Sequence, residues 1–251
     1  MKKLLFFATL VAFASCSSDD NSSPEENNNQ IPTPDLKGKL KMMEAQYFIY
    51  EDGIRKDYVL KVEPSYGANG YINQTKTTDT YDNSVSFRYY DYSGNNIVKM
   101  RYELEGENYE TSYTYKGDLI VESTNNEEQG LHIRSYDYNS IDEKIKETYF
   151  RKTSTLNSIT DYTYSNGNII KEVINYKEDG FPIEPIVNTY SYDNKNSAQK
   201  GAFPDNYLML VGDGKNNMIK YNNLVYTYEY NADNYPTKRF SEYAVTTYLY
   251  Y

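Results

Sequence analysis

Tyrosines alternate with polar residues in a short phrase that recurs along the chain. The clearest copy runs over residues 162–172, where Tyr162 and Tyr164 are separated by Thr163. Residues two apart in a strand point to the same face, so Tyr162 and Tyr164 share a face while Asp161 and Thr163 point away. Further copies of the phrase begin at Tyr90, Tyr113, Tyr136, Tyr190, Tyr228 and Tyr248.

In the clearest copy a tight turn follows the tyrosine pair. Asn166-Gly167 is a strong signal for a two-residue hairpin, because a type I′ turn needs positive φ at both central positions. From Tyr90 to Tyr190 the copies start 23, 23, 26 and 28 residues apart. Two strands of about seven to eight residues with their turns fill such a period and leave no room for crossover helices. The pattern therefore predicts an antiparallel meander built of hairpins.

The composition decides how such hairpins assemble. The hydrophobic fraction is 39%, but it includes 31 tyrosines, and the mean hydropathy is −0.82. A thick core between two packed sheets is hard to fill with so few aliphatic residues, whereas a tyrosine buries its ring and keeps its hydroxyl wet. We therefore predict an all-β domain of about a dozen strands over residues 36–251, strongly curved or barrel-like, open or closed.

One segment interrupts the rhythm. The copy after Tyr190 begins 38 residues later, and residues 197–223 between them hold short apolar, Gly-Asp-Gly and Asn-Asn stretches. Function is often grafted where a repeat becomes irregular. The residues that we predict to bind a ligand are Tyr207, Asp213, Asn216 and Asn217.

The N-terminus is typical of a targeting segment. Lys2 and Lys3 precede an apolar stretch, residues 4–13, that is too short to span a bilayer, so residues 1–15 are expected to be a signal peptide. Cys16, the only cysteine, follows at once and resembles the lipobox cysteine of bacterial lipoproteins. The resemblance implies acylation of Cys16, with chains such as palmitate, and anchoring in a membrane. An ordinary cleaved signal with an incidental thiol is the alternative.

The next stretch is expected to be a disordered tether, because residues 17–35 are rich in Ser, Asn, Asp, Glu and Pro. Ser18-Asp19-Asp20 resembles the acidic signal that places Bacteroidetes-type lipoproteins on the outside of the outer membrane. The alternatives are a solvated linker and a periplasmic orientation. We expect no transmembrane span in the mature chain.

The repeats resemble those of two known groups. The phrase is distantly similar to the YD-type repeat of Rhs-class bacterial surface and toxin proteins. Residues 226–238 and the Asn216-Asn217 pair resemble more closely a family of Bacteroidetes-type lipoproteins of unknown function with a porin-like fold. This resemblance implies a strongly curved β-meander and no particular activity.

Charge and residue content limit the chemistry. A formal net charge of −10 gives no electrostatic reason to bind nucleic acid. With Cys16 as the only cysteine and His132 as the only histidine, a catalytic triad and a zinc site both lack residues. Asp213, Asn216 and Asn217 could hold calcium, but Asp, Asn and Gly are ordinary turn residues. We expect no metal, no cofactor and no catalytic residue.

The sequence favours a non-enzymatic binding or scaffold role in the cell envelope, with a glycan, peptide or protein as ligand. A hydrolase that processes glycans with two carboxylates stays open, because acidic residues are abundant and nothing selects a pair. A purely structural spacer is the third possibility. A cleft flanked by two acids would favour the enzyme, an exposed tyrosine patch near the insertion would favour binding, and fully packed tyrosines would favour the spacer.

Overall fold

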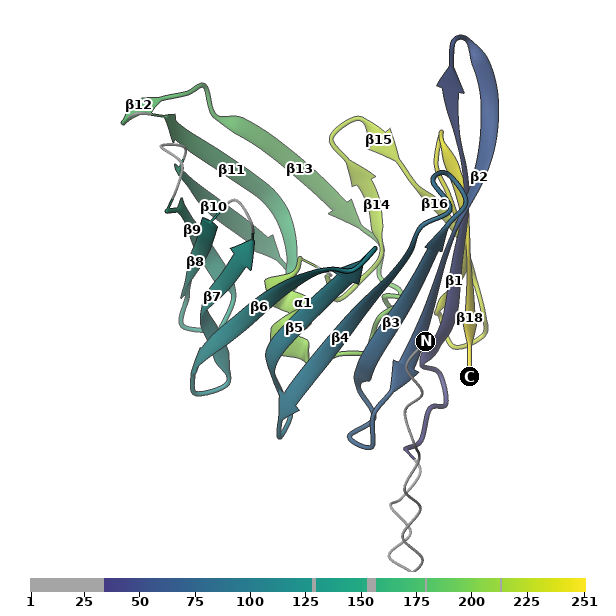
Figure 1. Ribbon diagram of the computed structural model, residues 1–251, viewed down its shortest axis with the longest axis horizontal. Helices are drawn as coiled ribbons and strands as arrows, with labels where there is room; N and C mark the ends of the chain where they lie inside the picture. The colour runs from purple at the N-terminus through teal and green to yellow at the C-terminus, as the bar shows by residue number, and fades with distance from the viewer. Residues whose placement is uncertain (1–33, 128–129, 153–156, 179, 213) are drawn as a thin grey trace, which may run out of the picture. The chain divides into compact units, whose positions relative to one another are not determined.

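The described residues form an antiparallel meander that curls into a nearly closed, barrel-shaped sheet (Figure 1). The computed structural model describes residues 34–127, 130–152, 157–178, 180–212 and 214–251. The first nine strands are β1 (Leu40–Glu51), β2 (Ile54–Tyr66), β3 (Ile72–Asp79), β4 (Val85–Ser93), β5 (Asn96–Leu104), β6 (Glu107–Lys116), β7 (Leu119–Glu127), β8 (Gly130–Tyr138) and β9 (Lys144–Arg151). The remaining elements are β10 (Asn157–Ser165), β11 (Asn168–Glu178), β12 (Phe181–Pro182), β13 (Ile186–Tyr192), α1 (Asp205–Leu210), β14 (Met218–Tyr221), β15 (Leu224–Val225), β16 (Thr227–Tyr230), β17 (Pro236–Phe240) and β18 (Ala244–Tyr250).

Sequential pairing and a final closure define the topology. Each strand from β1 to β11 pairs with the next, β13 pairs with both β11 and β14, and β18 returns to pair with β1. β15 and β16 are separated by one residue, Tyr226, whose N–H donates to the carbonyl of Ile219 on β14 at 2.9 Å. The fold class predicted from the sequence is confirmed, although eighteen strands in the described residues exceed the predicted dozen.

The predicted hairpin turns are present. Asn166 and Gly167 have φ of 54° and 76°, the left-handed values that a type I′ turn requires. The strands expected around residues 47–50 and 58–62 are parts of β1 and β2, joined by a turn at Asp52-Gly53. None of the helices in these described ranges has the length and apolar character needed to span a bilayer.

In six places a tyrosine hydroxyl bonds a backbone carbonyl of the preceding part of the sheet, which accounts for part of the repeated phrase. The strand that follows a turn is bulged, so that Tyr92 pairs with Ile97 and Tyr115 with Ile120. A bulge leaves ladder groups unpaired. The hydroxyl of Tyr115 donates to the carbonyl of Ile97 at 2.8 Å. We call these bonds tyrosine latches; they join Tyr66 to Leu40, Tyr92 to Ile72, Tyr115 to Ile97, Tyr138 to Ile120, Tyr228 to Met218 and Tyr250 to Pro236.

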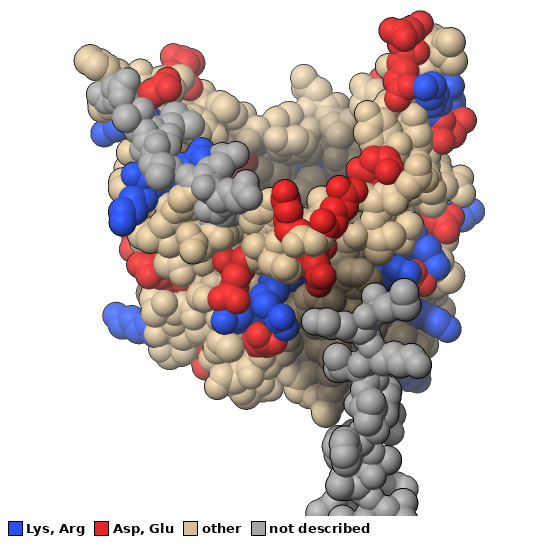
Figure 2. All heavy atoms as spheres, viewed as in Figure 1, with Lys and Arg blue, Asp and Glu red and all other residues tan. Residues whose placement is uncertain are grey.

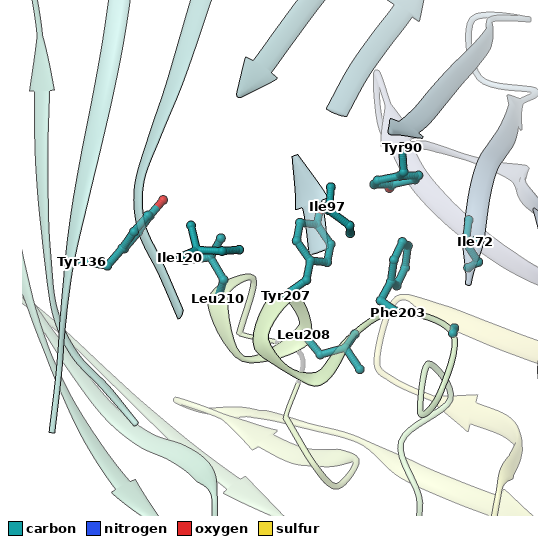
Figure 3. Packing of buried hydrophobic residues seen from close by; sticks show 10 residues of the cluster. Ile72, Tyr90, Ile97, Ile120, Tyr136, Phe203, Tyr207, Leu208 and Leu210 are labelled. Atoms are coloured by element: carbon teal, nitrogen blue, oxygen red, sulfur yellow. The ribbon is translucent and has the colours of Figure 1, made fainter. Parts of the chain in front are cut away.

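Part of the segment that interrupts the repeats lies inside the barrel and packs against its wall. Figure 3 shows the side chains of Phe203, Tyr207 and Leu210 pointing toward residues of the barrel wall. We call residues 202–212, which include α1, the plug. The buried cluster joins it to the wall and consists of Ile72, Tyr90, Ile97, Ile120, Tyr136, Ala202, Phe203, Tyr207, Leu208 and Leu210.

The plug lies toward the end of the barrel where the hairpins turn tightly. The side-chain amide of Asn206 donates to the carbonyl of Asp118, in the turn between β6 and β7, at 2.6 Å. The N–H of Ile72 donates to the carbonyl of Ala202 at 2.9 Å. Toward the other end, where the β1–β2 hairpin and β11–β13 rise, the surface is hollowed (Figure 2).

Candidate functional site

The candidate site includes a lysine at a position that isoleucine occupies in several other hairpins. Four buried isoleucines each pair, at a bulge, with the tyrosine that precedes a turn: they are Ile72, Ile97, Ile120 and Ile169. In the β8–β9 hairpin the corresponding partner of Tyr138 is Lys144, only 3% exposed. A buried cation is costly unless it is paired. Of these five positions, only that of Lys144 holds a charged side chain.

The ammonium of Lys144 is held between the plug and the wall. Its Nζ donates to the carbonyl of Leu210, the last residue of α1, at 2.8 Å. Glu147 Oε2 lies 3.6 Å from Nζ, and the Tyr162 ring centroid 4.4 Å from it. Burial lowers the pKa of Lys144, and the nearby carboxylates of Glu147 and Glu172 oppose that shift.

A second cation and a tyrosine complete the surroundings of Glu147. Arg134 Nε lies 3.3 Å from Glu147 Oε1, and the hydroxyl of Tyr162 donates to Glu147 Oε2 at 3.2 Å. Burial, together with the charges of Glu147 and Glu172, raises the pKa of Tyr162. The charge of Glu147 is thus balanced from two sides, and Tyr162 stays a neutral donor.

Glu172 lies on β11, in the next part of the wall. Its Oε1 accepts hydrogen bonds from Asn188 Nδ2 at 2.7 Å and from the Tyr190 hydroxyl at 2.6 Å. Tyr190 stacks on Tyr221 with ring centroids 5.3 Å apart. Burial and the bond to Glu172 raise the pKa of Tyr190.

These groups border a cavity of about 350 Å³, which falls in the size range of small-ligand pockets. Both carboxylates, Lys144 and three tyrosines supply its polar wall, while Ile169, Met218 and the end of the plug supply its apolar wall. We call it the wall–plug cavity; it is lined by Lys144, Glu147, Tyr162, Ile169, Glu172, Tyr190, Tyr192, Leu210, Val211, Gly212 and Met218. The insertion thus contributes to a cavity through the C-terminal end of α1.

The four residues predicted to bind a ligand have different surroundings. Tyr207 is 7% exposed and packs against Tyr90, Tyr113 and Phe203 in the core. Asn216 exchanges hydrogen bonds with Asn168 and donates to the carbonyl of Lys195.

Asn217 is buried and donates to Asp193 and to the carbonyl of Asn196. Asn216 and Asn217 also line a separate cavity of about 240 Å³, with Arg239 and Tyr228. Asp213 and the predicted lipid-attachment residue Cys16 lie outside the described residues. Of the three described residues, Asn216 and Asn217 line the same cavity and Tyr207 does not.

His132, the only histidine of the sequence, lies on β8. Its Nδ1 is 2.9 Å from the hydroxyl of Tyr149. In the part of the chain that the structure describes, no group of three or more His, Cys, Asp or Glu side chains is close enough to hold a metal ion.

The sequence analysis missed Lys144, Glu147 and Glu172. The signal for Lys144 was present, since it follows a Tyr-x-Tyr pair and a turn. The turn there spans residues 139–143, and Ile141 and Ile145 beside Lys144 fit the apolar slot of the phrase better. Both of these isoleucines are exposed, at 71% and 40%, so the register of the bulge and not the residue type selects Lys144 for burial.

Comparison with known proteins identifies the architecture. No family model matches the chain, and no curated protein matches its sequence. Among solved structures, a porin-like protein from Bacteroides uniformis superposes with a TM-score of 0.54. The two chains share a fold. The match covers 84% of this chain and 98% of the other at 12% sequence identity. At this identity the likeness concerns the fold alone, so membership of the lipoprotein family and kinship with YD-type repeats stay predictions.

Proposed function

We propose that this chain is a cell-envelope lipoprotein that captures a small ligand inside its barrel without transforming it. The observation that carries the proposal is the wall–plug cavity, in which polar side chains converge beside an apolar wall. Lys144, which is buried there, occupies a position that isoleucine occupies in other hairpins. A cavity with few converging polar groups and an apolar lining is the usual form of a ligand site. A spacer has no need of such a cavity.

The location follows from the N-terminal pattern and agrees with the fold. Cys16 after a short apolar segment supports lipid attachment, and Ser18-Asp19-Asp20 supports an outward-facing position on the outer membrane. The likeness to a porin-like protein is consistent with a place in the envelope. Labelled palmitate should enter the wild-type protein and not Cys16→Ser, and membrane fractionation should show the same difference. Equal labelling of both proteins would refute the anchor.

A cavity-filling variant tests the binding role. Val211 lies at the end of the plug, lines the wall–plug cavity and is 52% exposed, so Val211→Trp should fill the cavity without disturbing the core. A panel of sugars, peptides, amines and organic acids is screened by thermal shift, because a ligand that binds only the native state raises Tm. A saturable shift that disappears in Val211→Trp is expected.

Val225→Trp is the matched control, because Val225 is 56% exposed on β15 and does not line this cavity. This variant should bind like the wild type. A ligand that binds equally well to Val211→Trp would exclude the cavity as the site, and no shift with any compound of the panel would refute small-ligand capture.

One observation keeps the hydrolase as a second candidate. Glu147 and Glu172 line the same cavity, and glycoside hydrolysis requires two carboxylates flanking the substrate. Turnover of a glycan that is abolished in Glu147→Gln, with glycan binding retained, would establish this alternative. Binding without turnover in the wild type would establish capture.

A further inference from the structure

Glu172 gives the wall–plug cavity a carboxylate with no cation of its own. Its Oε1 accepts hydrogen bonds from Asn188 and Tyr190, and both donors are neutral. Within the described ranges, no Lys, Arg or His forms an ion pair with Glu172, whereas Glu147 is paired with both Lys144 and Arg134. The residues lining the cavity include two carboxylates and one ammonium. Arg134, which is not among the lining residues, supplies a second cation to Glu147 and forms no ion pair with Glu172.

Three tyrosines line the cavity together with this carboxylate. They are Tyr162, Tyr190 and Tyr192. The face of an aromatic ring attracts a cation, most strongly where water is excluded. Lys144 illustrates the arrangement in the same wall, since its ammonium lies 4.4 Å from the centroid of the Tyr162 ring and 3.6 Å from Glu147. Glu172 and the tyrosines of the cavity also combine a carboxylate with aromatic rings, but no lysine or arginine of the described residues forms an ion pair with this carboxylate.

The rest of the lining favours an organic cation over a metal ion. Ile169, Leu210 and Met218 give the cavity an apolar side that suits alkyl groups. A metal such as calcium requires six to eight oxygen ligands, and the one carboxylate without a cation falls far short of that number. The net charge of −10 also raises the local concentration of cations around the protein.

We propose that the wall–plug cavity binds a small organic ammonium ion, with its nitrogen against Glu172 and the tyrosine rings and its alkyl part against Ile169 and Met218. This inference rests on the capture function proposed above, because it uses the same cavity. It adds the charge of the ligand and the residue that selects it.

Calorimetric titration of the full chain tests the inference. The probes are n-butylammonium and tetramethylammonium, with 1-butanol and butyrate as neutral and anionic counterparts of similar size. We expect saturable binding of an ammonium probe and none of 1-butanol or butyrate. Binding of the primary ammonium alone would assign selectivity to the hydrogen bond with Glu172. Binding of both ammonium ions would assign it to the ring faces. Either result supports the proposal.

Charge variants locate the binding. Glu172→Gln keeps the side-chain shape and an oxygen for Asn188 and Tyr190 but removes the charge, so Kd for the ammonium probe should rise at least about tenfold. Glu172→Asp retains the charge and should retain measurable binding. Glu178→Gln is the matched control, because Glu178 is exposed on the same strand. Circular dichroism and Tm of each variant confirm that it is folded.

The outcomes separate this inference from the broader function. Unchanged ammonium binding in Glu172→Gln, or equal binding of 1-butanol, overturns the inference. A sugar or acid whose binding is abolished by Val211→Trp and unaffected by Glu172→Gln also overturns it, while capture in the cavity stands. If no probe and no panel compound binds, both proposals fall.

Discussion

At the scale of single residues, the tyrosines act through their hydroxyls as much as through their rings. A tyrosine latch satisfies a carbonyl that a bulge has removed from the ladder, and buried carbonyls without a partner are costly. The series of latches is interrupted at the repeat that follows Lys144. The hydroxyl of Tyr164, in that repeat, is buried and has no partner among the described residues. Two departures from the repeat thus occur in neighbouring hairpins close to the plug.

Tyr115→Phe tests the latch. The change removes only the hydroxyl that donates to the backbone carbonyl of Ile97. Ile97 is fully buried, so its carbonyl is left without this partner. We expect the free energy of unfolding to fall by about 1–3 kcal/mol, measured by urea denaturation. Tyr50→Phe is the control, because Tyr50 is 66% exposed, and it should change stability very little. Equal effects of the two changes would show that the latch contributes nothing.

At the scale of elements, the plug is the piece on which the barrel core depends. α1 has only six residues and no side-chain cap, so it is not stable by its own hydrogen bonds. Its order comes from the side chains that it buries against the wall, as Figure 3 shows for Phe203, Tyr207 and Leu210. The hydrogen bond from Lys144 Nζ to the carbonyl of Leu210 adds a polar attachment at its C-terminal end.

Phe203→Ala tests this dependence. Phe203 is 6% exposed and packs against Tyr90 and Tyr207, so truncation leaves a cavity in the core. We expect a loss of about 3–5 kcal/mol in the free energy of unfolding. Phe181→Ala makes the same change at a residue that is 75% exposed and should cost far less. A small loss in Phe203→Ala would show that the barrel is stable without the plug.

The elements also show how far sequence reasoning reached. Hairpins and turns were predictable because alternation and Asn-Gly chemistry act within a few residues, as at Asn166-Gly167. The plug was predicted only as an irregular segment, since Tyr207 and Leu208 are buried by strands distant in sequence. For the same reason Tyr207 was chosen as a ligand residue. Lys144 was missed because its burial depends on the register of a bulge, and the apolar residue beside it, Ile145, is the one that the sequence pattern would place inside.

At the scale of the whole molecule, the tyrosines make the fold sensitive to alkali. Burial raises the pKa of Tyr115, Tyr136 and Tyr138 to about 12, and that of several other tyrosines still further. In the unfolded chain a tyrosine ionises near pH 10. A group whose pKa is raised by folding contributes stability that is complete below the unfolded pKa and is lost as pH rises toward the folded one.

We therefore expect stability to be constant with respect to these groups up to about pH 10 and to fall between about pH 10 and 12. Tyrosinate absorbance and circular dichroism, followed together against pH, provide the measurement. The buried tyrosines should ionise together with the loss of β structure. Smooth ionisation of all the tyrosines near pH 10 with the fold intact would contradict this expectation.

The direction of the tyrosine latches has a consequence for the order in which the protein can assemble. In all six latches the acceptor precedes the donor in the chain, as Ile72 precedes Tyr92 and Ile97 precedes Tyr115. A chain that emerges with its N-terminus first therefore presents each carbonyl before the hydroxyl that will bind it. Each new hairpin can dock on a finished one, and only the pairing of β18 with β1 has to wait for the last residues.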